Sequence, residues 1–120
     1  MDRPYRYIEV EPHPPLVCVR LKQREFSDPE LENLGDEIAR LVDEEGCRKL
    51  VLELGPSEPQ CLYSVFLAKL VNLQKRLETD GGALALANLN PTTLAIFEAA
   101  GLDTFFRFFP DVATACAALK

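Results

Sequence analysis

The sequence has 120 residues, of which 48% are apolar and 27% are charged, and its formal net charge is −6. This size and balance are typical of one globular domain with a single core, and they argue against a disordered chain. The negative charge argues against binding to nucleic acid or to an anionic membrane surface, since both kinds of binding need a basic surface.

The N-terminal part of the chain is predicted to form two strands. Residues 5–11 alternate between apolar and polar side chains and carry aromatic and β-branched residues, which favours a strand. Residues 16–21 form a short apolar run of strand length. The intervening "PHPP" interrupts the pattern, so the two strands are expected to pair as an antiparallel hairpin.

A long amphipathic helix is predicted over residues 27–46. Ser27 or Asp28 is a suitable N-cap, Pro29 occupies the first helical position, and Gly46 ends the helix. Apolar side chains recur every three or four residues along it, at Leu31, Leu34, Ile38, Leu41 and Val42. The opposite face is acidic and is interpreted as solvated, with a dedicated binding role as the alternative; it holds Glu30, Glu32, Asp36, Glu37, Asp43, Glu44 and Glu45.

Strands alternate with helices over the rest of the chain. Residues 49–55 and 83–88 are nearly continuous apolar runs, as expected for strands covered on both faces. The remaining segments are helices at about 64–79, 90–101 and 111–119 and a strand at 104–109. The helix at 64–79 is expected to bury a core stripe of Phe66, Leu70, Leu73 and Leu77. The order β-β-α-β-α-β-α-β-α predicts one α/β domain over residues 1–120, with a mostly parallel central sheet and helices packed on it.

The sequence contains no recognisable motif of an enzyme active site. Neither of the common phosphate-binding glycine motifs is present. A serine hydrolase would need His13 as its base, but this histidine lies in the proline-rich turn, and Ser64 lacks the G-x-S-x-G elbow. We therefore expect no catalytic residues and no cofactor, and Ser64 is most simply the N-cap of its helix.

The four cysteines lack the closely spaced pairs of a structural zinc site, so no metal is expected. Cys18, Cys47 and Cys116 lie in apolar surroundings, where reduced thiols pack as small hydrophobes. Cys61 precedes a helix start, where the pKa of a thiol tends to fall. No apolar run approaches the roughly 20 residues of a membrane span, and the first residues do not resemble a signal peptide, so the expected location is the cytoplasm.

Two further features leave alternatives open. Glu53 lies near the carboxyl end of a predicted buried strand, where ligands collect in open α/β sheets, although a structural carboxylate is the simpler interpretation. The aromatic segment "TFFRFF" is interpreted as core and edge packing, with an exposed interaction patch as the alternative.

The second half of the chain resembles the STAS domain, the family of anti-sigma factor antagonists. The resemblance rests on "KLVLELG" followed by a loop and a helix, and then on "RLETDGGALALANLNPTTLAIFEAAGLDTFF". The spacing of the family is matched by Gly81 and Gly82, by residues 88–91, and by Gly101 and Leu102. The β-β-α order of the N-terminal part agrees as well, so the resemblance covers nearly the whole chain.

Members of this family typically bind a regulatory protein, often an anti-sigma factor that is also a serine kinase. An Asp-Ser-Ser-Gly motif opens the relevant helix, and phosphorylation of its second serine releases the partner by charge repulsion. Counting back from Gly81, this motif falls on Tyr63, Ser64, Val65 and Phe66. The acceptor serine is thus replaced by valine, and the phosphorylation switch is not expected to carry over.

The resemblance implies a protein-binding module that contacts a kinase-like anti-sigma factor or another signalling partner. The residues expected to bind the partner surround the helix start: Cys61, Tyr63, Ser64, Val65, Phe66 and Lys69. One alternative is a small-ligand or nucleotide-binding domain that uses Glu53. Another is a phosphorylation-regulated antagonist in which Ser64 is the acceptor. Self-association as a homodimer is also left open.

Overall fold

The order of strands and helices follows the sequence prediction throughout. The structure is a computed structural model that describes residues 5–55 and 64–119. The strands are β1 (Ile8–His13), β2 (Leu16–Leu21), β3 (Lys49–Glu53), β4 (Ala83–Ala87) and β5 (Arg107–Phe109). The helices are α1 (Asp28–Glu45), α2 (Ser64–Thr79), α3 (Pro91–Ala99) and α4 (Val112–Leu119).

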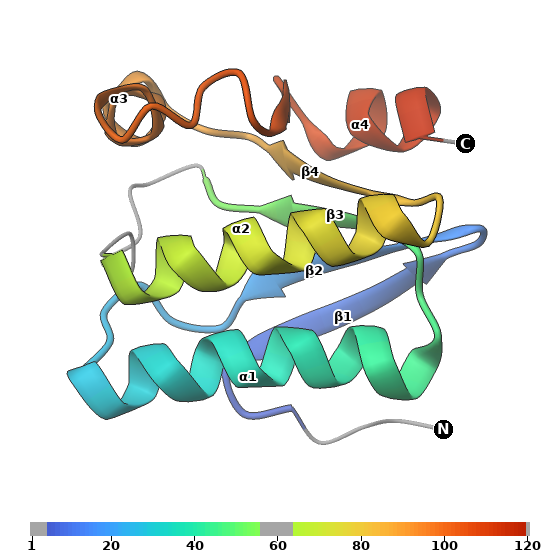
Figure 1. The fold of residues 1–120 in the computed structure, drawn as a ribbon, viewed down its shortest axis with the longest axis horizontal. Helices are drawn as coiled ribbons and strands as arrows, with labels where there is room; N and C mark the ends of the chain where they lie inside the picture. Colours follow the sequence, from blue (N-terminus) through green and yellow to red (C-terminus); the bar gives the residue numbers. More distant parts are fainter. Residues whose placement is uncertain (1–4, 56–63, 120) are drawn as a thin grey trace.

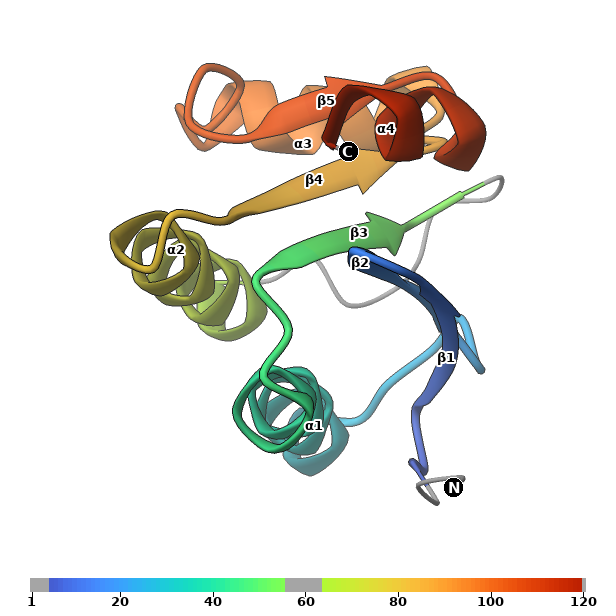
Figure 2. The ribbon, with the colours of Figure 1, turned by 90° about the vertical axis from the view of Figure 1, so that its right-hand side faces the viewer.

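The five strands form one sheet in the order β1-β2-β3-β4-β5. β1 and β2 form the predicted antiparallel hairpin, and all later neighbours are parallel. The long helices α1 and α2 lie side by side on one face of this sheet (Figures 1 and 2). The α/β class and the mostly parallel sheet are therefore confirmed.

The cores on the two faces of the sheet differ in size. Leu84 and Leu86 of β4 belong to the large core beneath α1 and α2. Ala85 and Ala87, between and beside them, face a second and smaller core that α4 covers. Because side chains alternate across a strand, the "ALALA" sequence sends its large residues to one face and its small ones to the other.

The ends of α1 show the predicted capping residues. Ser27 is the N-cap, and its hydroxyl and the Glu30 carboxylate form a reciprocal capping box. The hydrogen bonds from Ser27 lower the pKa of the Glu30 carboxyl group. Gly46 ends the helix in the left-handed conformation, with φ of 63°, which glycine adopts without steric cost.

The aromatic segment before α4 packs into the core, as the simpler interpretation had it. Phe106 is buried and lies edge-on to Phe97 of α3, with ring centroids 5.8 Å apart. Phe105 and Phe108 are half-buried and pack against the same core. The strand itself is shorter than predicted, because only residues 107–109 pair with β4.

Glu37 corrects the prediction that the acidic side of α1 is entirely solvated. Its side chain is buried and accepts hydrogen bonds from the backbone N–H groups of Arg6 and Tyr7, at 2.7 and 2.8 Å. Both oxygens are used, so the carboxylate satisfies two donors in the segment that enters β1. Charge-assisted bonds of this kind are stronger than neutral ones, and Glu37 therefore fastens α1 to the start of the sheet.

Replacing Glu37 with alanine is expected to lower the free energy of unfolding by about 2–4 kcal/mol, because two backbone donors lose their acceptor. Urea-induced unfolding measures this change. The matched control is Glu32→Ala, an exposed position on the same helix, which should change stability by no more than about 0.5 kcal/mol. Equal effects of the two substitutions would contradict the assigned role of Glu37.

Candidate functional site

The start of α2 presents a polar and an apolar side chain to solvent. Ser64 is the first residue of the helix and is exposed. This position differs by one residue from the predicted N-cap. Val65 is 47% exposed. Within residues 5–55 and 64–119, no other large apolar side chain is classed as exposed. Cys61 and Tyr63, also predicted to bind a partner, lie outside the described residues.

Phe66 corrects one of the predicted contacts. Its side chain is fully buried in the core beneath α1 and α2. It begins the predicted apolar stripe of α2, which continues through Leu70, Leu73 and Leu77. Since successive residues on a helix point about 100° apart, the burial of Phe66 leaves Val65 facing outward. Phe66 therefore anchors the helix tip, and its side chain is not available to a partner.

A groove separates the beginnings of α1 and α2. Its volume is about 560 Å³, and its lining combines apolar and acidic groups: Asp28, Pro29, Leu31, Glu32, Ser64 and Val65. Asp28 and Glu32 are exposed, so they bring negative charge to an otherwise largely apolar surface. The groove can accept an apolar side chain and favours cationic groups beside it.

Lys69, one turn after Val65, points toward α1. Its ammonium group pairs with Asp36 at 2.9 Å. The aliphatic part of its side chain crosses Gly35, where a Cβ atom would lie only 2.1 Å from Lys69 Cδ. A second ion pair, between Arg76 and Asp43, joins the same two helices farther along. Lys69 thus links α2 to α1 beside the groove, and α1 and α2 approach closely because residue 35 lacks a side chain.

Glu53 lies on the other side of the sheet. One carboxylate oxygen accepts from Arg20 Nε at 3.0 Å and the other from Asn88 Nδ2 at 2.9 Å. This pairing raises the pKa of the Arg20 guanidinium. Arg20, Glu53 and Ala87 are register partners across β2, β3 and β4, and Ala87 belongs to the core under α4. The structure therefore separates Glu53 from the groove at Ser64 and Val65.

Sequence reasoning missed the contribution of α1 to the groove. Asp28, Leu31 and Glu32 were assigned to a cap, a core stripe and a solvated face. A signal was nevertheless present, because two successive parallel crossovers on one face place both helix starts at the same end of the sheet. The predicted alternation of strands and helices, together with the observed sheet order, therefore explains why the starts of α1 and α2 are neighbours.

The structure contains few features that would favour other kinds of site. Within residues 5–55 and 64–119, no three His, Cys, Asp or Glu side chains are grouped so that they could hold a metal ion. In the same part of the chain, no helix has both the length and the apolar character that crossing a membrane requires.

Comparison with known proteins decides the family. The model of the STAS domain matches residues 7–115. The chain belongs to the STAS domain family. No curated protein matches this STAS domain significantly.

Solved structures share the STAS fold at low sequence identity. An anti-sigma factor antagonist from Mycobacterium paratuberculosis has a TM-score of 0.77 and 22% identity, with 99% of this chain and 98% of that chain covered. A STAS domain protein from Planctomyces limnophilus has a TM-score of 0.76 and 18% identity, covering 93% and 97%. The Bacillus cell fate determinant SpoIIAA in its phosphorylated form has a TM-score of 0.68 and 17% identity, covering 94% and 99%.

A structural role for Glu53 has a direct test. Glu53→Gln is expected to lower the free energy of unfolding by about 1–2 kcal/mol, because the amide nitrogen must face either Arg20 or Asn88, which are both donors. Chemical denaturation measures the loss. Glu78→Gln, at an exposed position of α2, is the control and should be nearly neutral. If Glu53→Gln is as stable as the unaltered protein, these two bonds do not hold the strand ends together.

Proposed function

We propose that this STAS domain is a regulatory protein-binding module of the anti-sigma factor antagonist type and acts without catalysis. The observation that carries the proposal is Val65, exposed at the tip of α2 beside an apolar groove. An exposed valine side chain does not stabilise the free protein. Burying it against a partner removes apolar surface from water, which favours the complex. The family membership supports a regulatory role, and the cytoplasm is the location we propose for it.

The partner we propose is an anti-sigma factor of the serine kinase type that presents a basic surface. Asp28 and Glu32 at the groove, together with the net charge of −6, favour cationic groups on the partner. Complementary charge mainly accelerates association and aligns the two surfaces, while the buried apolar contact holds the complex. Binding should therefore weaken as the salt concentration rises.

In this proposal the complex is not controlled by phosphorylation at the usual position. Valine stands where the resemblance places the acceptor serine, and valine has no hydroxyl group to modify. Its apolar side chain favours a permanent contact over a switched one. Cys61 and Tyr63 remain proposed contacts on the sequence resemblance alone, and Lys69 is proposed to contribute at the edge of the groove.

A second regulatory mode has one observation in its favour, namely the exposed hydroxyl of Ser64. A phosphate on Ser64 would add about two negative charges to a groove that already holds Asp28 and Glu32, and would oppose an acidic or apolar contact there. Phosphate-specific mass spectrometry after incubation with the kinase and ATP, with Ser64→Ala as the control, tests this mode. An unmodified Ser64 would exclude it for that kinase.

Val65→Asp is expected to weaken partner binding by at least about 2 kcal/mol, or roughly 30-fold in Kd, because a charge replaces the apolar contact. Titration calorimetry with candidate anti-sigma factor kinases from the same cell measures the loss. The matched control is Ala113→Asp, which also places a charge on an exposed helix position, but on α4.

The control variant should bind like the unaltered protein. If Val65→Asp also binds normally, the groove is not the contact surface. Sedimentation of the same variants separates partner binding from self-association. If Val65 forms a homodimer contact instead, Val65→Asp converts a dimer to a monomer in the absence of any partner.

A further inference from the structure

Two cysteines that are 98 positions apart in the sequence lie in contact. Cys18 on β2 and Cys116 on α4 are both buried, and their Sγ atoms are 3.5 Å apart. We propose that this pair is an oxidation site, which a small neutral hydroperoxide converts to a disulfide between the sheet and α4.

The contact follows from the small side chains of this face. Glu11, Cys18, Val51 and Ala85 are register partners across four neighbouring strands. α4 packs on the same face through Ala115, Cys116 and Leu119. Because small residues line both sides, the helix approaches closely enough for the two thiols to meet. Cys47 belongs elsewhere, since its thiol lies 3.9 Å from the carbonyl oxygen of Lys49.

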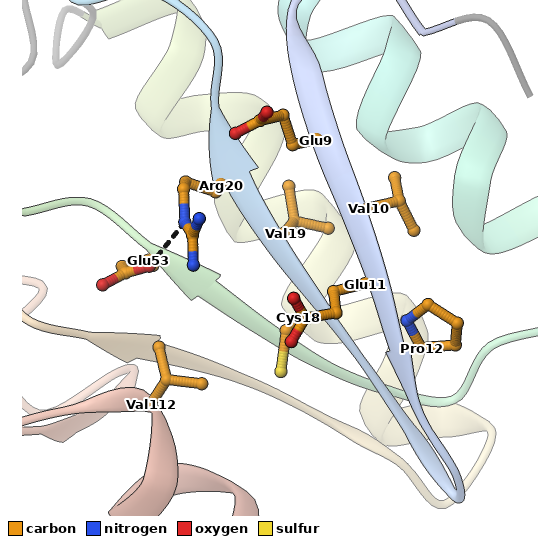
Figure 3. Close-up of a pocket in the computed structure, with 9 residues that line it drawn as sticks. All are labelled: Glu9, Val10, Glu11, Pro12, Cys18, Val19, Arg20, Glu53 and Val112. Atoms are coloured by element: carbon orange, nitrogen blue, oxygen red, sulfur yellow. Dashed lines mark hydrogen bonds and ion pairs between the residues drawn. The ribbon is translucent and has the colours of Figure 1, made fainter.

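The pair lies beside a cleft of about 260 Å³ (Figure 3). Cys18 lines this cleft together with Val112 and the charged residues Glu9, Glu11, Arg20 and Glu53. Cys116 is not among its lining residues. Because Cys18 lines the cleft, we assign to it the reaction with the oxidant, and Cys116 then completes the disulfide.

The charges around the cleft select the class of oxidant. Three carboxylates face one guanidinium, and that guanidinium is already paired with Glu53. Anionic oxidants such as glutathione disulfide are disfavoured by this excess of negative charge. Hydrogen peroxide is neutral and small enough for the cleft, so it is the oxidant we assign to this site.

The reaction balances in two steps. The Cys18 thiolate attacks one peroxide oxygen, and the O–O bond breaks. The attacked oxygen stays on sulfur as the OH of a sulfenic acid, and the other oxygen leaves as hydroxide, which takes up one proton to become water. The thiolate of Cys116 then attacks the Cys18 sulfur, the S–S bond forms and the S–O bond breaks. The hydroxide that leaves takes up one proton to become the second water, so the two protons used are those that the two thiols released. Overall two thiols are oxidised and one hydrogen peroxide is reduced to two waters.

The surroundings make this oxidation slow at neutral pH. Burial raises the pKa of Cys18 to about 12, and the neighbouring Cys116 thiol and the carboxylates of Glu11 and Glu53 raise it in the same direction. Since the thiolate is the reactive form, the rate should rise about tenfold for each pH unit from about pH 7 to pH 9. The site therefore responds to sustained exposure to peroxide and stays reduced during brief exposure.

Peptide mapping of the full chain tests the proposal. The protein is reduced, freed of reductant, treated with hydrogen peroxide, alkylated and digested with trypsin without reduction. Each cysteine then falls in a different tryptic peptide, with Cys18 in residues 7–20 and Cys116 in residues 108–120. The expected product is these two peptides joined, with a mass lower by two hydrogen atoms than their sum. Absence of this product, or linkage of either peptide to Cys47 or Cys61, would overturn the proposal.

Single substitutions separate the roles of the two thiols. In Cys116→Ala the sulfenic acid cannot be resolved, so dimedone should label Cys18. In Cys18→Ala, Cys116 should remain unlabelled. Cys47→Ala is the matched control and should form the Cys18–Cys116 disulfide at the unaltered rate. Labelling of Cys116 in Cys18→Ala would contradict the assigned order of attack.

The pH dependence in the unaltered protein needs no substitution, so it tests the site even if a variant fails to fold. A rate of disulfide formation that does not change from about pH 7 to pH 9 would exclude a buried thiol as the attacking group. The site lies on the α4 side of the sheet, away from the groove at Val65. The result of the oxidation experiment is therefore independent of whether the groove binds a partner.

Discussion

The alternation of large and small residues in the central strands is the constraint on which the molecule depends. Leucines fill one face of β4 and alanines the other. The leucine face provides the deep layer that two helices of 18 and 16 residues cover. On the alanine face, the eight-residue helix α4 packs on the sheet through Ala115, Cys116 and Leu119. The groove between α1 and α2 thus lies on one side of the sheet and the paired thiols lie on the other.

The deep layer also determines what the start of α2 can present. Phe66 is held in the core, which fixes the rotation of the helix and turns Val65 outward. Neighbouring crossovers place the start of α1 next to that of α2, so the apolar tip lies beside carboxylates. The candidate surface is therefore a product of the packing beneath it, and the same packing would orient whatever side chain stood at position 65.

The sequence predicted those features that depend on local order. The strand and helix order, the N-cap of α1, its end at Gly46 and its apolar stripe follow from short-range patterns, and the structure contains all of them. Phe66 illustrates the limit of such patterns. It was placed both in the core stripe and in the contact surface, and only the packing of α2 on the sheet decides between these positions.

The side-chain contacts that escaped prediction involve residues far apart in the chain. In the sequence, Glu37 does not differ from the other acidic residues of α1. Its role depends on the backbone N–H groups of the segment that enters β1. Glu53 was recognised as a strand-end carboxylate, but its two partners were not. Arg20 lies in β2, and Asn88 directly follows β4. The Cys18–Cys116 contact joins opposite parts of the sequence. No periodicity encodes such contacts, because they depend on how complete elements are stacked.

The missing side chain at Gly35 affects the spacing of α1 and α2. Lys69 crosses the space that a side chain at position 35 would occupy, and the two helices whose starts form the groove are spaced accordingly. A larger residue at this position would act as a wedge between α1 and α2. A change at position 35 could therefore alter the spacing of the two helices while the residues that line the groove stay the same.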